Sequence, residues 1–174
     1  YEKIDISLDE LEAKKEEEGT TGALIKGVLF GVRERGYKIG GFQVYITSDV
    51  LIGAGLSSSA AFETIIGTII SGLYNDMSIS PVDIAMIGQF AENKFNKVNC
   101  GIMDQFAIAM GKEGQAIFLD TATLKYKYAP IKLEDTKIIL CTDAGLSSDK
   151  IKKYNIKDGR AFVITQSLKK LKSE

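Results

Sequence analysis

The chain has 174 residues, of which 45% are apolar and 26% charged, and its formal net charge is −1. This composition is typical of a globular domain with a sizeable core. The near-neutral charge argues against a nucleic-acid partner, and no polybasic stretch points to a membrane surface. The sequence contains no histidine, which excludes Ser-His-Asp catalysis, Cys-His catalysis and histidine-ligated metal sites.

The two cysteines indicate whether the protein is in a reducing or an oxidising compartment. Cys100 and Cys141 lie far apart and lack the spacing of a metal site. We expect two free thiols in a reducing environment, with a single disulfide left open as the alternative. The charged N-terminal stretch YEKIDISLDE is unlike a signal peptide. These features predict a cytoplasmic location.

Hydrophobic periodicity predicts two strands and two helices in the first part of the chain. They are a strand at 3–8, a helix from Thr20 or Thr21 to about Gly36, a strand at 41–49, and a helix at 57–74. The last of these is apolar on nearly every side and is interrupted by Glu63, so we expect a core helix rather than a membrane span.

The second part mixes helices with strands. A helix begins at Ser80 as N-cap, with Pro81 in the first turn and Asp83 reaching back, and ends near Asn96. The further elements predicted are a short helix at 103–110, a hairpin at 115–120 and 124–131, a strand at 137–143, and a helix at 158–172. This order predicts an α+β fold.

The stretch GAGLSSSAAFE, from Gly53 to Glu63, joins a predicted strand to the core helix. Its glycines allow a ligand to approach the backbone, and the helix start offers unpaired N–H groups to an anion. The serine hydroxyls can bind phosphate oxygens or Mg²⁺. The stretch is neither a Walker A loop nor a dinucleotide fingerprint. The alternative is a helix start that is merely well capped.

A second stretch, AENKFNKVNCGIMDQF, carries two acids across a turn between helices. Glu92 lies near the end of one helix and Asp104 in the first turn of the next. The helix dipole should keep Asp104 ionised. A carboxylate there can accept or orient a hydroxyl proton, and Glu92 can hold a metal, as phosphoryl transfer requires. The alternative is that Asp104 caps a helix and Glu92 is a solvated charge.

Together the two stretches resemble the GHMP family of small-molecule kinases. GAGLSSSAAFE is similar to the family's ATP-binding motif. AENKFNKVNCGIMDQF is similar to the segment with the catalytic aspartate in those members that act on galactose. The likeness continues through AIFLD to SSDKIKKYN and covers most of the chain. Lys97 departs from the pattern, because it stands where the family usually has glycine.

The resemblance implies ATP-dependent phosphorylation, with Mg²⁺, of the anomeric hydroxyl of galactose or a closely related sugar. The implied Mg²⁺ ligands are Ser58 and Glu92. Asp104 would face the sugar hydroxyl as general base or as orienting group, and Gly101 and Tyr154 would lie against the sugar. The residues implied to hold the ATP phosphates are Gly53, Ala54, Gly55, Leu56, Ser57, Ser58, Ser59 and Ala60.

The implied fold is the GHMP kinase N-terminal domain, a mixed sheet packed on helices with a left-handed crossover, of a type shared with a small-subunit ribosomal protein. Residues 1–150 are expected to form part of that domain. Residues 151–174 are expected to begin the inter-domain or C-terminal helical region. The family's first motif and C-terminal domain are absent from the sequence, so we expect no turnover from this chain alone.

Two alternatives stay open. One is a non-catalytic relative, either a sugar sensor or a decayed kinase. The intact Ser59-Ala60 pair argues against the sensor, whereas an altered tail at 157–162 argues for decay. The other is a GHMP kinase with a different substrate, such as mevalonate, which fits the serine stretch but not CGIMDQF.

Overall fold

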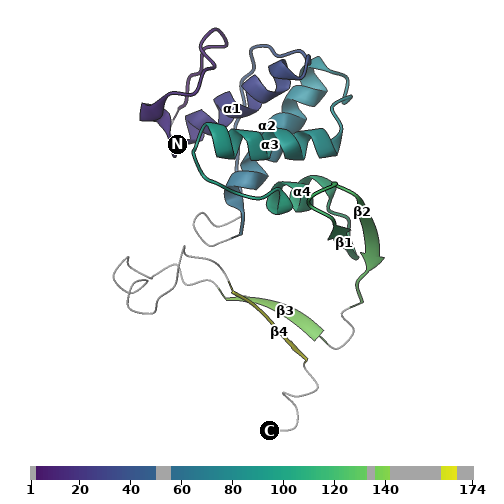
Figure 1. The fold of residues 1–174 in the computed structure, drawn as a ribbon. Helices are drawn as coiled ribbons and strands as arrows, with labels where there is room; N and C mark the ends of the chain where they lie inside the picture. The colour runs from purple at the N-terminus through teal and green to yellow at the C-terminus, as the bar shows by residue number, and fades with distance from the viewer. Residues whose placement is uncertain (1–2, 50–55, 133–135, 142–161, 168–174) are drawn as a thin grey trace, which may run out of the picture. The chain divides into compact units, whose positions relative to one another are not determined.

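A computed structural model describes residues 3–49, 56–132, 136–141 and 162–167 (Figure 1). Its contacts divide the chain into two compact units. The first comprises Tyr1–Tyr45 and Ser59–Ala129, and the second comprises Ile46–Ser58 and Pro130–Glu174.

The first unit is mainly helical. Its helices are α1 (Thr21–Glu34), α2 (Ser58–Tyr74), α3 (Pro81–Lys94) and α4 (Met103–Met110). They confirm the helices predicted from periodicity. Thr20 caps α1 by accepting the N–H of Ala23 at 3.1 Å, and Ser80 caps α3 by accepting the N–H of Asp83 at 3.1 Å. The Ser80 hydroxyl also donates to the Asp83 carboxylate at 2.7 Å, as the sequence suggested.

The core of this unit lies between α1 and α3, which pack closely (Figure 1). Val28, Val32 and Ile87 are completely buried there. Gly27 makes the close approach possible, because a Cβ at this position would lie 2.7 Å from the Cβ and 2.8 Å from the Cα of Ala91. The α1–α3 contact therefore depends on a residue without a side chain.

The segment before α1 is not the strand predicted at 3–8. Residues 3–7 have no regular structure, and none of the strands in the described part of the chain pairs with them. A short 3-10 helix, η1 (Lys15–Glu17), follows. The segment is fixed by Leu11, which is 1% exposed, and by an ion pair between Lys26 of α1 and Glu17.

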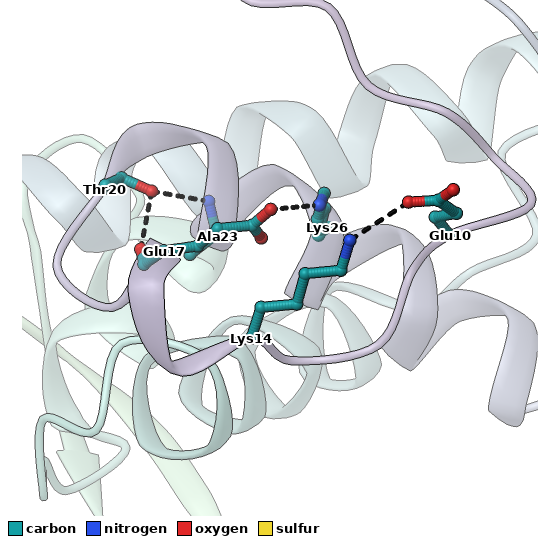
Figure 2. Close-up of polar contacts among 6 residues, drawn as sticks. All are labelled: Glu10, Lys14, Glu17, Thr20, Ala23 and Lys26. Atoms are coloured by element: carbon teal, nitrogen blue, oxygen red, sulfur yellow. Dashed lines mark hydrogen bonds and ion pairs between the residues drawn. The ribbon is translucent and has the colours of Figure 1, made fainter.

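Figure 2 compares this ion pair with a neighbouring one. The Lys26 Nζ lies 2.6 Å from Glu17 Oε1, with side chains only 11% and 28% exposed. The Lys14 Nζ lies 3.0 Å from Glu10 Oε2, with side chains 37% and 66% exposed. Since exposed pairs contribute about 0–1 kcal/mol, the Lys26–Glu17 pair is the one that ties the segment to α1.

The second predicted strand, at 41–49, is also irregular in the structure. The chain before it is bound to the end of α2 by side chains instead. Asn75 accepts the N–H of Lys38 at 2.8 Å and donates to the Lys38 carbonyl at 2.9 Å. The Tyr74 hydroxyl donates to the carbonyl of Gly41. These bonds occupy backbone groups that a strand would have offered to a neighbour.

A small second core holds α4 in place. Phe106 of α4 is completely buried, together with Ile102 and Ala85 of α3. The paired strands β1 (Gln115–Leu119) and β2 (Tyr126–Pro130) cover it and confirm the predicted hairpin. The ring of Tyr126 meets that of Phe106 edge to face, with centroids 5.3 Å apart. As a result α4 is fixed between α3 and the β1–β2 pair.

The second unit contains an antiparallel pair, β3 (Thr136–Cys141) and β4 (Phe162–Ser167), in which Thr136 is opposite Ser167. The helix predicted at 158–172 is therefore wrong for 162–167. The sequence FVITQS is rich in β-branched residues, which favour strands once a partner strand is present.

The α+β class is confirmed, with helices and two-stranded sheets in one chain. Within the described ranges, the helices are too short or too polar to span a lipid bilayer.

Candidate functional site

The serine stretch leads directly into α2. Of the residues implied to bind phosphate, the structure describes those from Leu56 onward, and Gly53, Ala54 and Gly55 lie outside the described residues. Ser57 has a φ of 57°, in the left-handed region, and α2 begins immediately after it. The hydroxyls of Ser58 and Ser59 therefore belong to the first helical turn, whose N–H groups have no intrahelical partner.

Beyond these serines the stretch enters the core. Ala60 is 2% exposed, whereas Leu56 and the three serines are half-buried. The arrangement fits both a phosphate-binding helix start and a well-capped one.

The turn between α3 and α4 is held by a side-chain clamp. Asn93 accepts the N–H of Cys100 at 2.9 Å and donates to the Cys100 carbonyl at 3.3 Å. Gln89 donates to the same carbonyl at 3.3 Å. The clamp fixes the backbone immediately before Gly101, although Lys97 in the same turn has a strained φ of 57°.

Gly101 and Asp104 follow the clamp. Gly101 is exposed, and a Cβ built on it would have no atom within 4 Å, so open space lies beside it. Asp104 is half-buried in the first turn of α4. It is not the N-cap of that helix, a position held by Ile102. The positive end of α4 stabilises the Asp104 carboxylate.

Glu92 is buried rather than solvated. It is 6% exposed on α3, which rules out the alternative that it is a surface charge. It lies against Glu63 of α2, which is 1% exposed. Gln105 of α4, which is 2% exposed, donates from Nε2 to Glu63 Oε2 at 3.2 Å. We call Glu63, Glu92 and Gln105 the buried polar cluster.

Burial changes the chemistry of the cluster. Loss of solvent, then the hydrogen bond to Glu92 and the charge of that residue, raise the pKa of Glu63 to about 10, while the Gln105 bond acts in the opposite direction. Glu63 is therefore a neutral acid near pH 7. Burial likewise raises the pKa of the Cys100 thiol.

The structure thus joins three helices that carry implied site residues: α2, α3 with Glu92, and α4 with Asp104. Tyr154 lies outside the described residues. Sequence reasoning missed Glu63 as the partner of Glu92, and Gln105 as the donor to Glu63. The available signal was Glu63, a glutamate inside an otherwise apolar helix. A buried carboxyl group of this kind requires a hydrogen-bonding partner.

A comparison with protein families shows to which family the chain is related. The family described as GHMP kinases N terminal domain matches residues 23–112, which is more than half of the chain. The chain belongs to the GHMP kinase family. The fold expected from the sequence is confirmed by this match.

The relatives of this GHMP kinase chain are named galactokinases. It is 44% identical over 131 residues to the galactokinase of Clostridium tetani, covering 75% of this chain and 33% of that protein. It is 46% identical over 125 residues to the galactokinase of Pyrococcus furiosus, covering 72% of this chain and 35% of that protein. The chain therefore spans about a third of the length of these curated relatives.

A solved structure extends the likeness. The crystal structure of Lactococcus lactis galactokinase complexed with galactose matches with a TM-score of 0.72 and 32% sequence identity. The match covers 87% of this GHMP kinase chain and 40% of that chain. The resemblance to the galactose-specific members of the family is confirmed.

Proposed function

We propose that the intact protein transfers the γ-phosphoryl group of ATP to the anomeric hydroxyl of galactose or a closely related sugar. The observation that carries this proposal is Asp104 in the first turn of α4, on a turn clamped by Asn93, in a chain 40–46% identical to proteins named galactokinase. A cytoplasmic location belongs to the same proposal, because Cys100 is a free thiol.

The phosphates of ATP are assigned to the start of α2. Residues 53–60 supply glycine backbone, serine hydroxyls and the unpaired N–H groups of the first helical turn, all of which bind anions. The helix dipole adds a partial positive charge at this end. No lysine or arginine lies within 53–60, so the backbone and hydroxyls hold the phosphates.

Ser58 and Glu92 are assigned to Mg²⁺. The donor set fits this ion, since Mg²⁺ prefers hard oxygens and usually takes one or two protein ligands beside phosphates and water. Glu92 Oε2 is buried and has no hydrogen-bond partner. In the described part of the chain no three acids, cysteines or histidines gather into a metal site. When bound, the ion neutralises charge on the transferring phosphoryl group.

Asp104 is assigned to the sugar hydroxyl. The hydroxyl oxygen forms the new bond to the γ-phosphorus as the bond from that phosphorus to the bridging oxygen of ADP breaks. Asp104 either accepts the hydroxyl proton or orients the hydroxyl for attack. Gly101, with open space at its Cα, and Tyr154 are assigned to the sugar. We retain 1–150 as part of the N-terminal domain and 151–174 as the start of the next region.

The test is Asp104→Asn in the intact protein. We expect kcat for sugar phosphorylation to fall at least about 100-fold, because a positioned acid–base group contributes roughly 10²–10⁴. The affinity for Mg·ATP, measured by calorimetry, should stay within about threefold, since no new charge enters the phosphate loop.

Asp83→Asn is the matched control, because Asp83 also lies in the first turn of a helix but belongs to the α3 cap. It should keep kcat within about twofold. Unchanged turnover in Asp104→Asn would remove the assignment. An intact wild type that binds sugar and ATP without transfer would instead identify the non-catalytic relative.

A further inference from the structure

We propose that Glu63 and Gln105 are positioning residues: their bond locks α4 and its Asp104 to α2, and Glu63 holds the Glu92 carboxyl group of α3 in place. This inference rests on the proposed function, and its closing experiment includes a binding measurement that does not depend on sugar phosphorylation. Neither residue belongs to the site implied by the sequence.

The first observation is the bond between two helices. Gln105 Nε2 donates to Glu63 Oε2 at 3.2 Å, although the residues are 42 positions apart in the sequence. Both side chains are almost completely buried, at 2% and 1% exposure. Gln105 directly follows Asp104, so any rotation of α4 that moved the Asp104 carboxylate would also break this bond.

The second observation comes from α3. A Cβ built on Gly88 would lie 3.1 Å from Gln105 Cγ and 3.1 Å from Glu63 Oε2. The helix that carries Glu92 therefore has no side chain at the place where the two positioning residues meet. This absence allows Glu63 and Gln105 to pack against the α3 backbone, one turn before Glu92.

The third observation concerns buried oxygen atoms that lack hydrogen-bond partners. Glu63 Oε1, Glu92 Oε2 and Gln105 Oε1 are buried oxygens without a hydrogen-bond partner among the described residues. The Glu63 and Glu92 carboxyl groups lie against each other inside the core. Glu63 thus accepts a bond from α4 through Oε2 and lies against the carboxyl group of Glu92 on α3.

The energetics favour orientation over stability as the reason for this arrangement. Apolar residues of similar size usually stabilise a core as well as a buried ionisable group does, or better. A hydrogen bond between buried side chains instead favours one geometry of the helices that it joins. The cluster connects the three helices that carry the end of the serine stretch, the proposed metal ligand Glu92 and the proposed catalytic Asp104.

The experiment uses four variants of the intact protein. Glu63→Gln keeps a donor towards Glu92 and an acceptor for Gln105, whereas Glu63→Met removes both. Gln105→Met removes the donor to Glu63 at nearly constant length. Ser71→Ala is the control, because Ser71 is also completely buried on α2 and its hydroxyl accepts the N–H of Ile79 at 3.2 Å, outside the cluster.

For Gln105→Met we expect kcat to fall about 10- to 100-fold with KM for sugar within about threefold, since a misplaced reacting group affects the chemical step. For Glu63→Met we expect the affinity for Mn²⁺ with ATP, measured by electron paramagnetic resonance with Mn²⁺ in place of Mg²⁺, to fall at least about 10-fold. Glu63→Gln should restore both properties to within about threefold. Ser71→Ala should lower Tm but keep both properties near wild type.

Three outcomes would overturn the proposal. One is a Gln105→Met protein that loses Tm as Ser71→Ala does but keeps its kcat. Another is a Glu63→Gln protein as impaired as Glu63→Met. If Gln105→Met does not fold, Gln105→Asn withdraws the amide by one methylene, and an unchanged kcat in that variant overturns the proposal equally.

A wild type that phosphorylates no sugar would contradict the proposed function instead. The comparison of Mn²⁺ binding between Glu63→Met and Glu63→Gln would still decide whether Glu63 holds Glu92. Equal Mn²⁺ affinities in those two variants would overturn the positioning role.

Discussion

Lys97 occupies a backbone conformation that suits glycine better. Its φ of 57° lies in the left-handed region, and its side chain is exposed in the turn before Gly101. For a residue with a Cβ this conformation costs about 1–2 kcal/mol, which the greater flexibility of glycine in the unfolded chain only partly offsets. We therefore expect Lys97→Gly to raise the free energy of unfolding by up to about 1 kcal/mol. Urea unfolding measures this change.

Lys97→Ala separates the backbone effect from the loss of charge. Alanine keeps the Cβ and thus the strain, so this variant should stay within about 0.5 kcal/mol of wild type. A Lys97→Gly protein no more stable than Lys97→Ala would show that the turn carries no strain at this residue.

Single residues also mark the limit of sequence-based prediction at the site. Asp104 and Glu92 were predicted from motifs, because local sequence is enough to recognise them. The burial of Glu92 against Glu63 of α2 was not, nor was the bond from Gln105 of α4 to Glu63. Three helices must be placed in space before a glutamate in α2 can be assigned a partner.

At the scale of the elements, the contact between α1 and α3 requires a residue without a side chain at position 27. Gly27→Ala would place a Cβ 2.8 Å from the Cα of Ala91, a backbone atom that cannot move aside easily. Overpacking of this kind costs about 1–3 kcal/mol and exceeds the gain of about 1 kcal/mol in helix propensity. We expect a net loss of up to about 2 kcal/mol in the free energy of unfolding, measured by urea unfolding.

Gly22→Ala is the control in the same helix. A Cβ at Gly22 would meet its nearest atom, Ile4 Cγ2, at an ordinary 3.7 Å. This variant should be neutral or more stable by up to about 1 kcal/mol. If both variants changed stability equally, helix propensity alone would explain them, and the close approach of α1 to α3 would be refuted.

The predicted elements succeeded where local signals agree with tertiary contacts. The four helices were predicted within two residues of their limits, and α1 and α3 begin at side-chain caps, Thr20 and Ser80, that the sequence shows. Residues 3–8 and 41–49 alternate like strands, but a strand needs a partner, and side chains such as Asn75 bind the backbone before 41–49 instead. Residues 162–167 were predicted as part of a helix but form a strand, because local sequence does not show their pairing with β3.

At the scale of the whole molecule, stability should be unevenly distributed. The α1–α3 contact contains completely buried residues, such as Val28 and Ile87, whereas β2 is mostly exposed and, among the described strands, pairs with β1 alone. We expect amides in the middle of α1 and α3 to exchange hydrogen slowest in the 174-residue chain. Those of β2 should exchange at least about 100-fold faster. Hydrogen exchange followed by mass spectrometry or NMR measures both.

Equal protection of β2 and α1 would contradict this distribution and indicate one cooperative unit. The division matters for function, since the proposed site residues Glu92 and Asp104 lie on α3 and α4, next to the most protected contact. A rigid base beneath an exposed turn is the usual arrangement for residues that must hold a fixed geometry.

The ion pair between Lys26 and Glu17 sets a practical boundary for anyone shortening this protein. A version starting at Thr20 would keep every residue of α1 yet leave the ammonium of Lys26 without its carboxylate, and would uncover the surface now sealed by Leu11. Choosing the start of a shortened chain from the helix limits alone would thus remove contacts that secondary structure does not show. A version that keeps the irregular segment from at least Glu10 onward retains the contacts that hold α1 in place.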